Sequence, residues 1–159
     1  MKQDRLDGWI RFIIIGVGIC ALVVYAAVIP MLGQSIIYDA PEFAGWYVPW
    51  LVFISITAIP VFIALCLCWK VTRNIGSDRS FSMENARLLK WVSWLAAADS
   101  AYFFIGNIVM LFLNMSHPGV TLLSLLVVFV GVAVSIAAAV LSHLIVKAAD
   151  LQEQSDLTI

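Results

Sequence analysis

Asp99 is the residue whose type and position most strongly suggest chemistry. It follows Trp91 by about eight residues inside a long apolar run, roughly 12 Å along a helix that rises 1.5 Å per residue. A carboxylate at that depth costs about 2.5–3.5 kcal/mol to insert, and by default it marks a functional site. Three interpretations stay open: a residue that only joins helices, a group that binds a proton or a ligand, and a contact between copies of the chain.

Other polar side chains share this segment with Asp99. Asn107 lies two turns further along, Phe103 stands between them on the same row, and Ser100 and Tyr102 add hydroxyl groups. Residues four apart lie on one face of a helix. The spacing therefore predicts a polar stripe that faces the helix bundle or a water-filled cavity.

His143 is the second candidate. Gly131, Ser135 and Ala139 precede it at intervals of four residues, a ladder of small residues that lets membrane helices approach closely. His143 would end this ladder near the membrane surface, where an imidazole could take up a proton or serve as an ordinary hydrogen-bonding residue. We group it with the intramembrane polar residues, because it and Asp99 belong to the same half of a helical hairpin.

The sequence carries no motif of a known catalytic site. It has no glycine-rich phosphate loop and no His-Glu-x-x-His, and its serines show neither a nucleophile elbow nor a Ser-x-x-Lys pattern. Cys20, Cys66 and Cys68 lie in apolar runs without a neighbouring His or acid, which favours small apolar packing residues over a metal site. We predict a protein that is not an enzyme and holds no cofactor or metal.

The composition requires that membrane helices position these residues. The chain is 63% hydrophobic and carries 9 basic and 10 acidic residues among 159, whereas soluble domains are about 45–50% apolar and 25% charged. Pro60 predicts a kink, and Pro118-Gly119 predicts the turn of a hairpin. Four apolar runs of spanning length predict a single-domain, all-α four-transmembrane-helix bundle, with spans at about 12–32, 48–69, 88–113 and 120–146.

The basic residues predict the orientation. Three precede the first span, five surround the connection between the second and third, and one follows the fourth, while connections 33–47 and 114–119 hold none. By the positive-inside rule both termini, the loop 70–87 and the tail 147–159 are cytoplasmic. A formal net charge of −1 gives no reason to expect direct binding of nucleic acid.

The cytoplasmic loop and tail have helical signals of their own. Ser80 or Ser82 is predicted to cap a helix, with Glu84 in its first turn. The tail is predicted to continue the fourth helix for two turns, with an acidic surface. The basic loop and the acidic tail could dock on each other, or a partner protein could use that surface.

Two short motifs carry a resemblance. The segment Phe81-Ser82-Met83-Glu84-Asn85 and the end Asp156-Leu157-Thr158-Ile159 resemble those of the bacterial membrane family known as domain of unknown function 2975. The family pattern has a glycine closer to the phenylalanine than Gly76 is here, so the turn is longer. The resemblance implies a small four-span protein of the bacterial inner membrane without an established activity.

Members of this family are often encoded beside a small Xre-like helix-turn-helix regulator. The resemblance therefore implies a membrane sensor or interaction partner of such a regulator. The alternative is a small homo-oligomeric transporter or channel-like protein, in which subunits share a pathway and Asp99 couples a proton or cation. The surface implied for docking the regulator comprises Phe81, Glu84, Asn85, Asp156 and Leu157.

Overall fold

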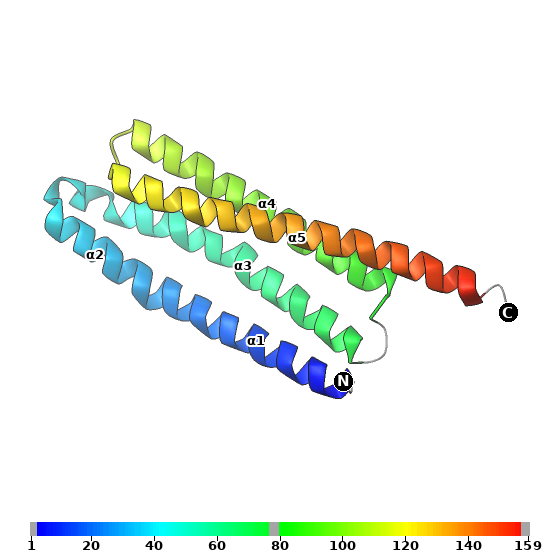
Figure 1. Ribbon diagram of the computed structural model, residues 1–159. Helices are drawn as coiled ribbons and strands as arrows, with labels where there is room; N and C mark the ends of the chain where they lie inside the picture. Colours follow the sequence, from blue (N-terminus) through cyan, green and yellow to red (C-terminus); the bar gives the residue numbers. More distant parts are fainter. Residues whose placement is uncertain (1–2, 77–79, 157–159) are drawn as a thin grey trace.

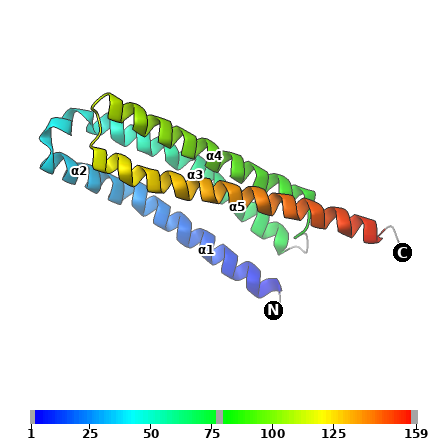
Figure 2. The same cartoon turned by 45° about the horizontal axis from the view of Figure 1, so that its top comes forward.

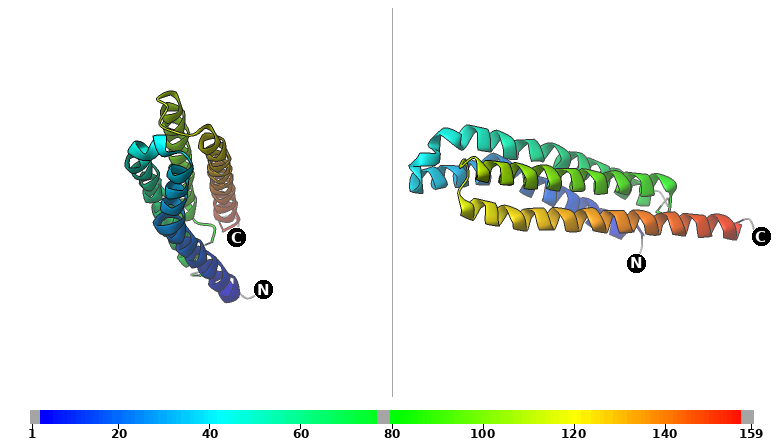
Figure 3. Two further views of the ribbon diagram at one scale, coloured as in Figure 1. Left: turned by 90° about the vertical axis from the view of Figure 1, so that its left-hand side faces the viewer. Right: turned by 90° about the horizontal axis from the view of Figure 1, so that it is seen from above.

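Four long helical segments lie side by side in the structure, a computed structural model that describes residues 3–76 and 80–156, and the side chains of 8–76 and 80–154. Figure 1 shows the connections α2–α3 and α4–α5 at one end, and the beginning of α1, the end of α3, the beginning of α4 and the last turns of α5 at the other. A perpendicular view shows the same grouping (Figure 3, right). The segments long and apolar enough to span a membrane are Gly8–Asp39, Pro41–Ile75, Met83–Phe112 and Pro118–Gln154. The all-α fold with four helices long and apolar enough to span a membrane is therefore confirmed. Each helix begins before its predicted span, and all but α4, which ends at Phe112, continue beyond it.

The first segment is one continuous rod with a widened turn in its middle. It consists of α1 (Gln3–Val23), the π-helical turn η1 (Val24–Val28) and α2 (Ile29–Asp39). Pro30 has no N–H to donate, and its ring would crowd the carbonyl four residues earlier in a regular helix. The Ile29 N–H instead donates to the Val24 carbonyl, five residues back. Most of the connection predicted at 33–47 is therefore helical.

The second segment begins with a short 3₁₀ turn, η2 (Pro41–Trp46), and continues as α3 (Tyr47–Ile75) through Pro60 without a break. Gly33 allows α2 and α3 to meet closely. A Cβ atom at Gly33 would lie 2.7 Å from Tyr47 Cε2 and 2.9 Å from Trp50 Cζ3. The aromatic rings at the start of α3 therefore pack directly on the α2 backbone.

The hairpin of α4 (Met83–Phe112) and α5 (Pro118–Asp156) has a defined signal at each helix end. Ser82 caps α4 by accepting the Asn85 N–H at 3.2 Å, and Glu84 lies in the first turn, which confirms that part of the prediction. At the other end Asn114 adopts a left-handed φ of 54°, while the Met115 N–H donates to the Met110 carbonyl at 2.9 Å. This is a Schellman ending with asparagine in the place of glycine.

The reversal between α4 and α5 differs from the prediction. Pro118 and Gly119 are the first residues of α5, where a missing N–H is harmless and a fixed φ is favourable. His117 precedes them, and its Nδ1 accepts the Gly119 N–H at 3.0 Å. The turn is thus made by Asn114 and the residues before Pro118.

A seam of small residues joins α4 to α5. Ser142 Oγ donates to the Ala86 carbonyl at 2.7 Å, and seven residues away on each helix Ser135 Oγ donates to the Ser93 carbonyl at 2.9 Å. The same contact surface continues to Gly131, four residues before Ser135 on α5, where an added Cβ would overlap Ser100 Oγ of α4. Close approach of this kind, with hydroxyls bonding across it, is how membrane helices associate.

The structure places two residues of the predicted small-residue ladder against α4 and the third outside that interface. Gly131 and Ser135 face α4, whereas Ala139 is exposed and Ala138 is buried in its place. The interface alternates steps of three and four residues, as helices that cross at a shallow angle require.

Replacing Ser142 with alanine is expected to have a small effect on stability. The substitution removes one hydrogen bond between helices, worth about 0.6 kcal/mol on average in membrane proteins, and the Ala86 carbonyl keeps its place in the α4 ladder. Unfolding of the purified protein in detergent should show this loss. A loss above about 2 kcal/mol would mean that the seam depends on this hydroxyl more than on close packing.

The first segment is held less tightly than the hairpin. No described side chain of α1 is buried, and α1 diverges from α5 towards its N-terminal end (Figure 2). Its contact there is with α3, where the Arg11 guanidinium lies 5.8 Å from the centre of the Trp69 ring. The segment most free to change its packing is therefore α1.

Candidate functional site

A cavity of about 420 Å³ lies within the membrane-spanning region, bounded by all four segments. Asp99, Ser100 and Asn107 from α4 line it, and Gly131 borders it from α5. The polar stripe predicted on this helix thus faces the interior of the bundle. The first segment and α3 supply the opposite wall through Val24, Tyr25, Ile29, Leu32, Trp50, Ile54, Thr57 and Val61.

Asp99 is half-buried and lacks a bonding partner of its own. Its carboxyl group makes no hydrogen bond and no ion pair with any residue that the structure describes. No Lys, Arg or His is among the described residues that line the cavity. Such an arrangement is unusual in a membrane, where ionisable groups pair with one another or with backbone groups.

The serine hydroxyls of the cavity already donate their protons to backbone carbonyls. Ser100 Oγ donates to the Ala96 carbonyl at 2.7 Å, and Ser124 Oγ donates to the Thr121 carbonyl at 2.6 Å. Each hydroxyl has one proton and two lone pairs. Both side chains therefore present acceptor oxygens to the cavity rather than donors.

Tyr25 and Thr57 continue this pattern on the opposite wall. Thr57 Oγ1 donates to the Ile54 carbonyl at 2.7 Å and lies 2.7 Å from the Tyr25 hydroxyl. Since the threonine proton is used, the tyrosine donates to the threonine. This bond joins the π-helical turn to α3 beside the cavity.

Sequence reasoning missed Tyr25 and Thr57. Their hydroxyls are polar groups in apolar runs, and Pro30 marks the irregular turn five residues after Tyr25. These signals place a polar residue on each helix, but they do not show that the two residues meet. Only the packing of the first segment against α3 brings them together.

Tyr102 and His143 lie outside the cavity, contrary to the prediction that groups them with Asp99. The Tyr102 hydroxyl donates to the Phe53 carbonyl at 3.3 Å, and the two rings are 5.0 Å apart. A Cβ on Gly106 would overlap the Phe53 ring, so this glycine makes room for α3. His143 is exposed, because its neighbour Ser142 occupies the interface with α4.

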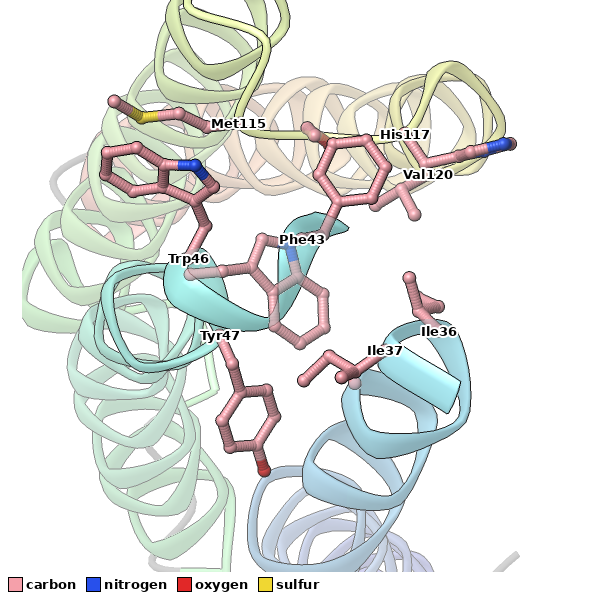
Figure 4. A pocket seen from close by; sticks show the side chains of 11 residues that line it. Ile36, Ile37, Phe43, Trp46, Tyr47, Met115, His117 and Val120 are labelled. Atoms are coloured by element: carbon pink, nitrogen blue, oxygen red, sulfur yellow. The ribbon is translucent and has the colours of Figure 1, made fainter. Parts of the chain in front are cut away.

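A second, smaller cavity of about 30 Å³ lies at the end of the bundle that holds the turns. Figure 4 shows Phe43, Trp46 and Tyr47 around it, with Ile36 and Ile37 on the α2 side. The volume suits one or two water molecules, not an organic ligand. The hydroxyls of Ser116, which lines this space, and of the nearby Thr121 are buried and have no hydrogen-bond partner among the described residues.

The residues implied for partner docking differ in their exposure. Phe81 is 59% exposed and Glu84 is also exposed, so both are available to a partner. Asn85 is 0% exposed, and its assignment to a docking surface is wrong. The Asp156 side chain and Leu157 lie outside the described residues.

Asn85 instead ties the end of α3 to the start of α4. Its Oδ1 accepts from Asn74 Nδ2 at 2.8 Å, and its Nδ2 donates to the Ser80 carbonyl at 3.2 Å. Its backbone N–H donates to Ser82 Oγ. The asparagine of the resemblance motif is therefore a buried structural residue.

Within the described residues, no three His, Cys, Asp or Glu side chains gather where they could hold a metal ion. The chemistry available to the larger cavity is that of one carboxyl group, several hydroxyl oxygens that accept hydrogen bonds, the amide of Asn107 and an apolar wall. Such a site can bind and select, and the mechanism of any response must come from the packing of the segments around it.

Comparisons with known proteins agree with a membrane protein. Residues 32–159 match the family described as Protein of unknown function (DUF2975). The chain is also 30% identical to the uncharacterized membrane protein YoaS of Bacillus subtilis (strain 168), in an alignment of 156 residues that covers 94% of each protein. No solved structure matches the chain.

Proposed function

The chain belongs to the DUF2975 family of membrane proteins of unknown function, and from that premise we propose that it is a non-enzymatic sensor of the bacterial inner membrane. In this proposal the cavity beside Asp99 receives the signal. The end of the bundle that holds the beginning of α1 and the last turns of α5 faces the cytoplasm and binds a helix-turn-helix regulator. The observation that carries the proposal is the cavity of about 420 Å³ into which Asp99 projects without a partner among the described residues.

The cavity is suited to reporting its own occupation. Its wall contains residues from every spanning segment, so a bound molecule contacts the loosely packed first segment and the hairpin together. A ligand shifts a conformational equilibrium only through different affinities for two arrangements. The first segment supplies the arrangement that can differ, since α1 has no buried side chain among those described.

The π-helical turn is the natural hinge for that change. Single π turns inside helices are frequent at functional sites, and η1 carries Tyr25, whose hydroxyl bonds to Thr57 at the cavity wall. A molecule that alters this bond changes how α1 packs against α3. The start of α1 lies at the same end of the bundle as the last turns of α5 (Figure 1).

The last turns of α5 offer a surface for a partner. The helix has 39 residues, about 58 Å at 1.5 Å per residue, whereas a bilayer with its headgroups is about 40–45 Å thick. Its end passes the beginning of α4 (Figure 1) and is exposed, with Leu151 between the acidic Asp150 and Glu153. The positive-inside pattern supports placing this end in the cytoplasm.

The experiment first asks whether a helix-turn-helix regulator is encoded beside the membrane protein, and then co-purifies the two, with and without residues 152–159. We expect association that the truncation weakens and that Asp99→Asn changes by several-fold, because the substitution alters the cavity and leaves the docking surface intact. Glu84→Gln is the converse control, since it changes the docking face and leaves the cavity unchanged.

Absence of association in the full-length protein and in every variant would contradict the proposal. If the reconstituted protein instead moves protons or cations across vesicles, and Asp99→Asn stops that flux, the transporter hypothesis replaces it. The two readouts are independent, so each experiment decides one of the alternatives.

A further inference from the structure

The charge balance of the larger cavity indicates the kind of molecule that it binds. Asp99 brings one carboxyl group to a wall whose described residues include no basic side chain. At the packing of α1 on α3, the Arg11 guanidinium lies over the Trp69 ring, and neither residue is among those that line the cavity. The missing counter-charge would therefore come with the ligand.

The hydrogen-bonding groups of the wall indicate the same class. Three hydroxyl groups of the wall donate their single proton to backbone carbonyls, namely those of Ser100, Ser124 and Thr57. The Tyr25 hydroxyl donates to Thr57. Asn107 uses one of its two Nδ2 hydrogens on the Phe103 carbonyl at 2.7 Å, so its side chain keeps one N–H donor and its carbonyl oxygen as an acceptor. An anion would meet a carboxylate and lone pairs, whereas a cationic donor meets acceptors.

The rest of the wall is apolar and aromatic. Trp50 and Phe103 line the cavity with valine, leucine and isoleucine side chains from α2, α3 and α5. Aromatic faces attract cations, and an aliphatic wall favours a ligand with a hydrophobic body. A volume of about 420 Å³ accommodates a compact organic molecule and exceeds what a bare metal ion would need.

We propose that this cavity binds a lipophilic organic ammonium ion whose N–H groups donate to Asp99 and the neighbouring acceptor oxygens while its apolar body lies against α2, α3 and α5. The proposal rests on the proposed sensor function and names the chemical class of its signal. The carboxylate and the ammonium group form a charge-assisted hydrogen bond in a setting of low dielectric, where such a pair is stronger than in water.

The test compares two probes that share one hydrocarbon cage, 1-aminoadamantane and 1-adamantanol. Binding of the radiolabelled compounds is measured on the full-length protein in lipid nanodiscs, with empty nanodiscs subtracted. In the wild-type protein we expect the amine to bind at least tenfold more tightly than the alcohol, a difference of about 1.4 kcal/mol. Asp99→Asn should remove this preference by weakening amine binding at least tenfold while alcohol binding stays within about twofold. Glu84→Gln, which removes an acid outside the cavity, should change neither.

Equal binding of the two probes by the wild-type protein, or no binding of either, would overturn the proposal without the need for any variant. Retained alcohol binding by Asp99→Asn shows that its cavity is folded. If Asp99→Asn alters regulator association while the wild-type protein binds neither probe, the cavity senses protons and the ammonium proposal is wrong. Probe binding needs no partner protein, so its failure leaves the sensor proposal standing, and failed co-purification leaves the binding result intact.

Discussion

Asn85→Ala is expected to lower the free energy of unfolding by about 2–4 kcal/mol. The Asn85 side chain has no exposed surface, and it bonds to the amide of Asn74 and the carbonyl of Ser80. Alanine takes the amide away from both partners, which are partly buried, and a polar group left unsatisfied in a buried site costs about 1–3 kcal/mol. Denaturant unfolding of the purified protein, followed by circular dichroism, measures the loss.

The neighbouring Glu84→Ala is the matched control. Glu84 is exposed in the first turn of α4, where its charge interacts with the helix dipole for about 0.3–1 kcal/mol. We expect a loss no greater than this, together with weaker association with the regulator. Equal losses of stability in the two variants would mean that Asn85 does not tie α3 to α4.

The same pair of residues shows what a motif can and cannot say. Glu84 and Asn85 are adjacent in the segment that carries the resemblance, so the sequence alone predicts the same docking role for both. In the helix they point in directions about 100° apart, and α3 packs against only one of them. A docking surface is a property of that packing, which the motif does not contain.

The fold itself followed from quantities that one sequence contains. Spanning length, apolar content and the Ser82 cap each depend on local chemistry, and the helices α4 and α5 begin and end close to the expected residues. The first segment ran further than expected, because residues 33–39 continue the helix and place Gly33 against the rings of Tyr47 and Trp50. This contact between α2 and α3 forms in a segment that the composition had predicted to be a connection.

The candidate site could be predicted where its members share one helix. Asp99 and Asn107 are separated by two turns of α4, so helical geometry alone placed them in one cavity. Tyr25 and Thr57 are 32 residues apart and on different helices. Their meeting depends on the packing of the first segment, for which the sequence offers no direct signal.

Gly131→Val is expected to cost about 1–3 kcal/mol or more, the range for adding bulk to a packed interior. A Cβ at this position overlaps Ser100 Oγ, which is held by its bond to the Ala96 carbonyl at 2.7 Å. Serine could rotate away from a single methyl group, so Gly131→Ala should cost less. The branched valine forces α5 away from α4 and weakens the Ser135–Ser93 bond. Unfolding in detergent measures the three proteins side by side.

Ala139→Val is the control that decides between two interpretations of the seam. A step of four residues turns the helix by about 400°, so a ladder of such steps drifts about 40° each time and has left the interface by Ala139, which is exposed. Valine there faces lipid and should change the free energy of unfolding by less than about 0.5 kcal/mol. If Ala139→Val were as costly as Gly131→Val, α5 would meet α4 along the ladder of fours, and His143 would return to the interface. A large cost at Gly131 alone means that steps of three and four residues align the two helices, and this alignment holds Ser100 beside the cavity that Asp99 lines.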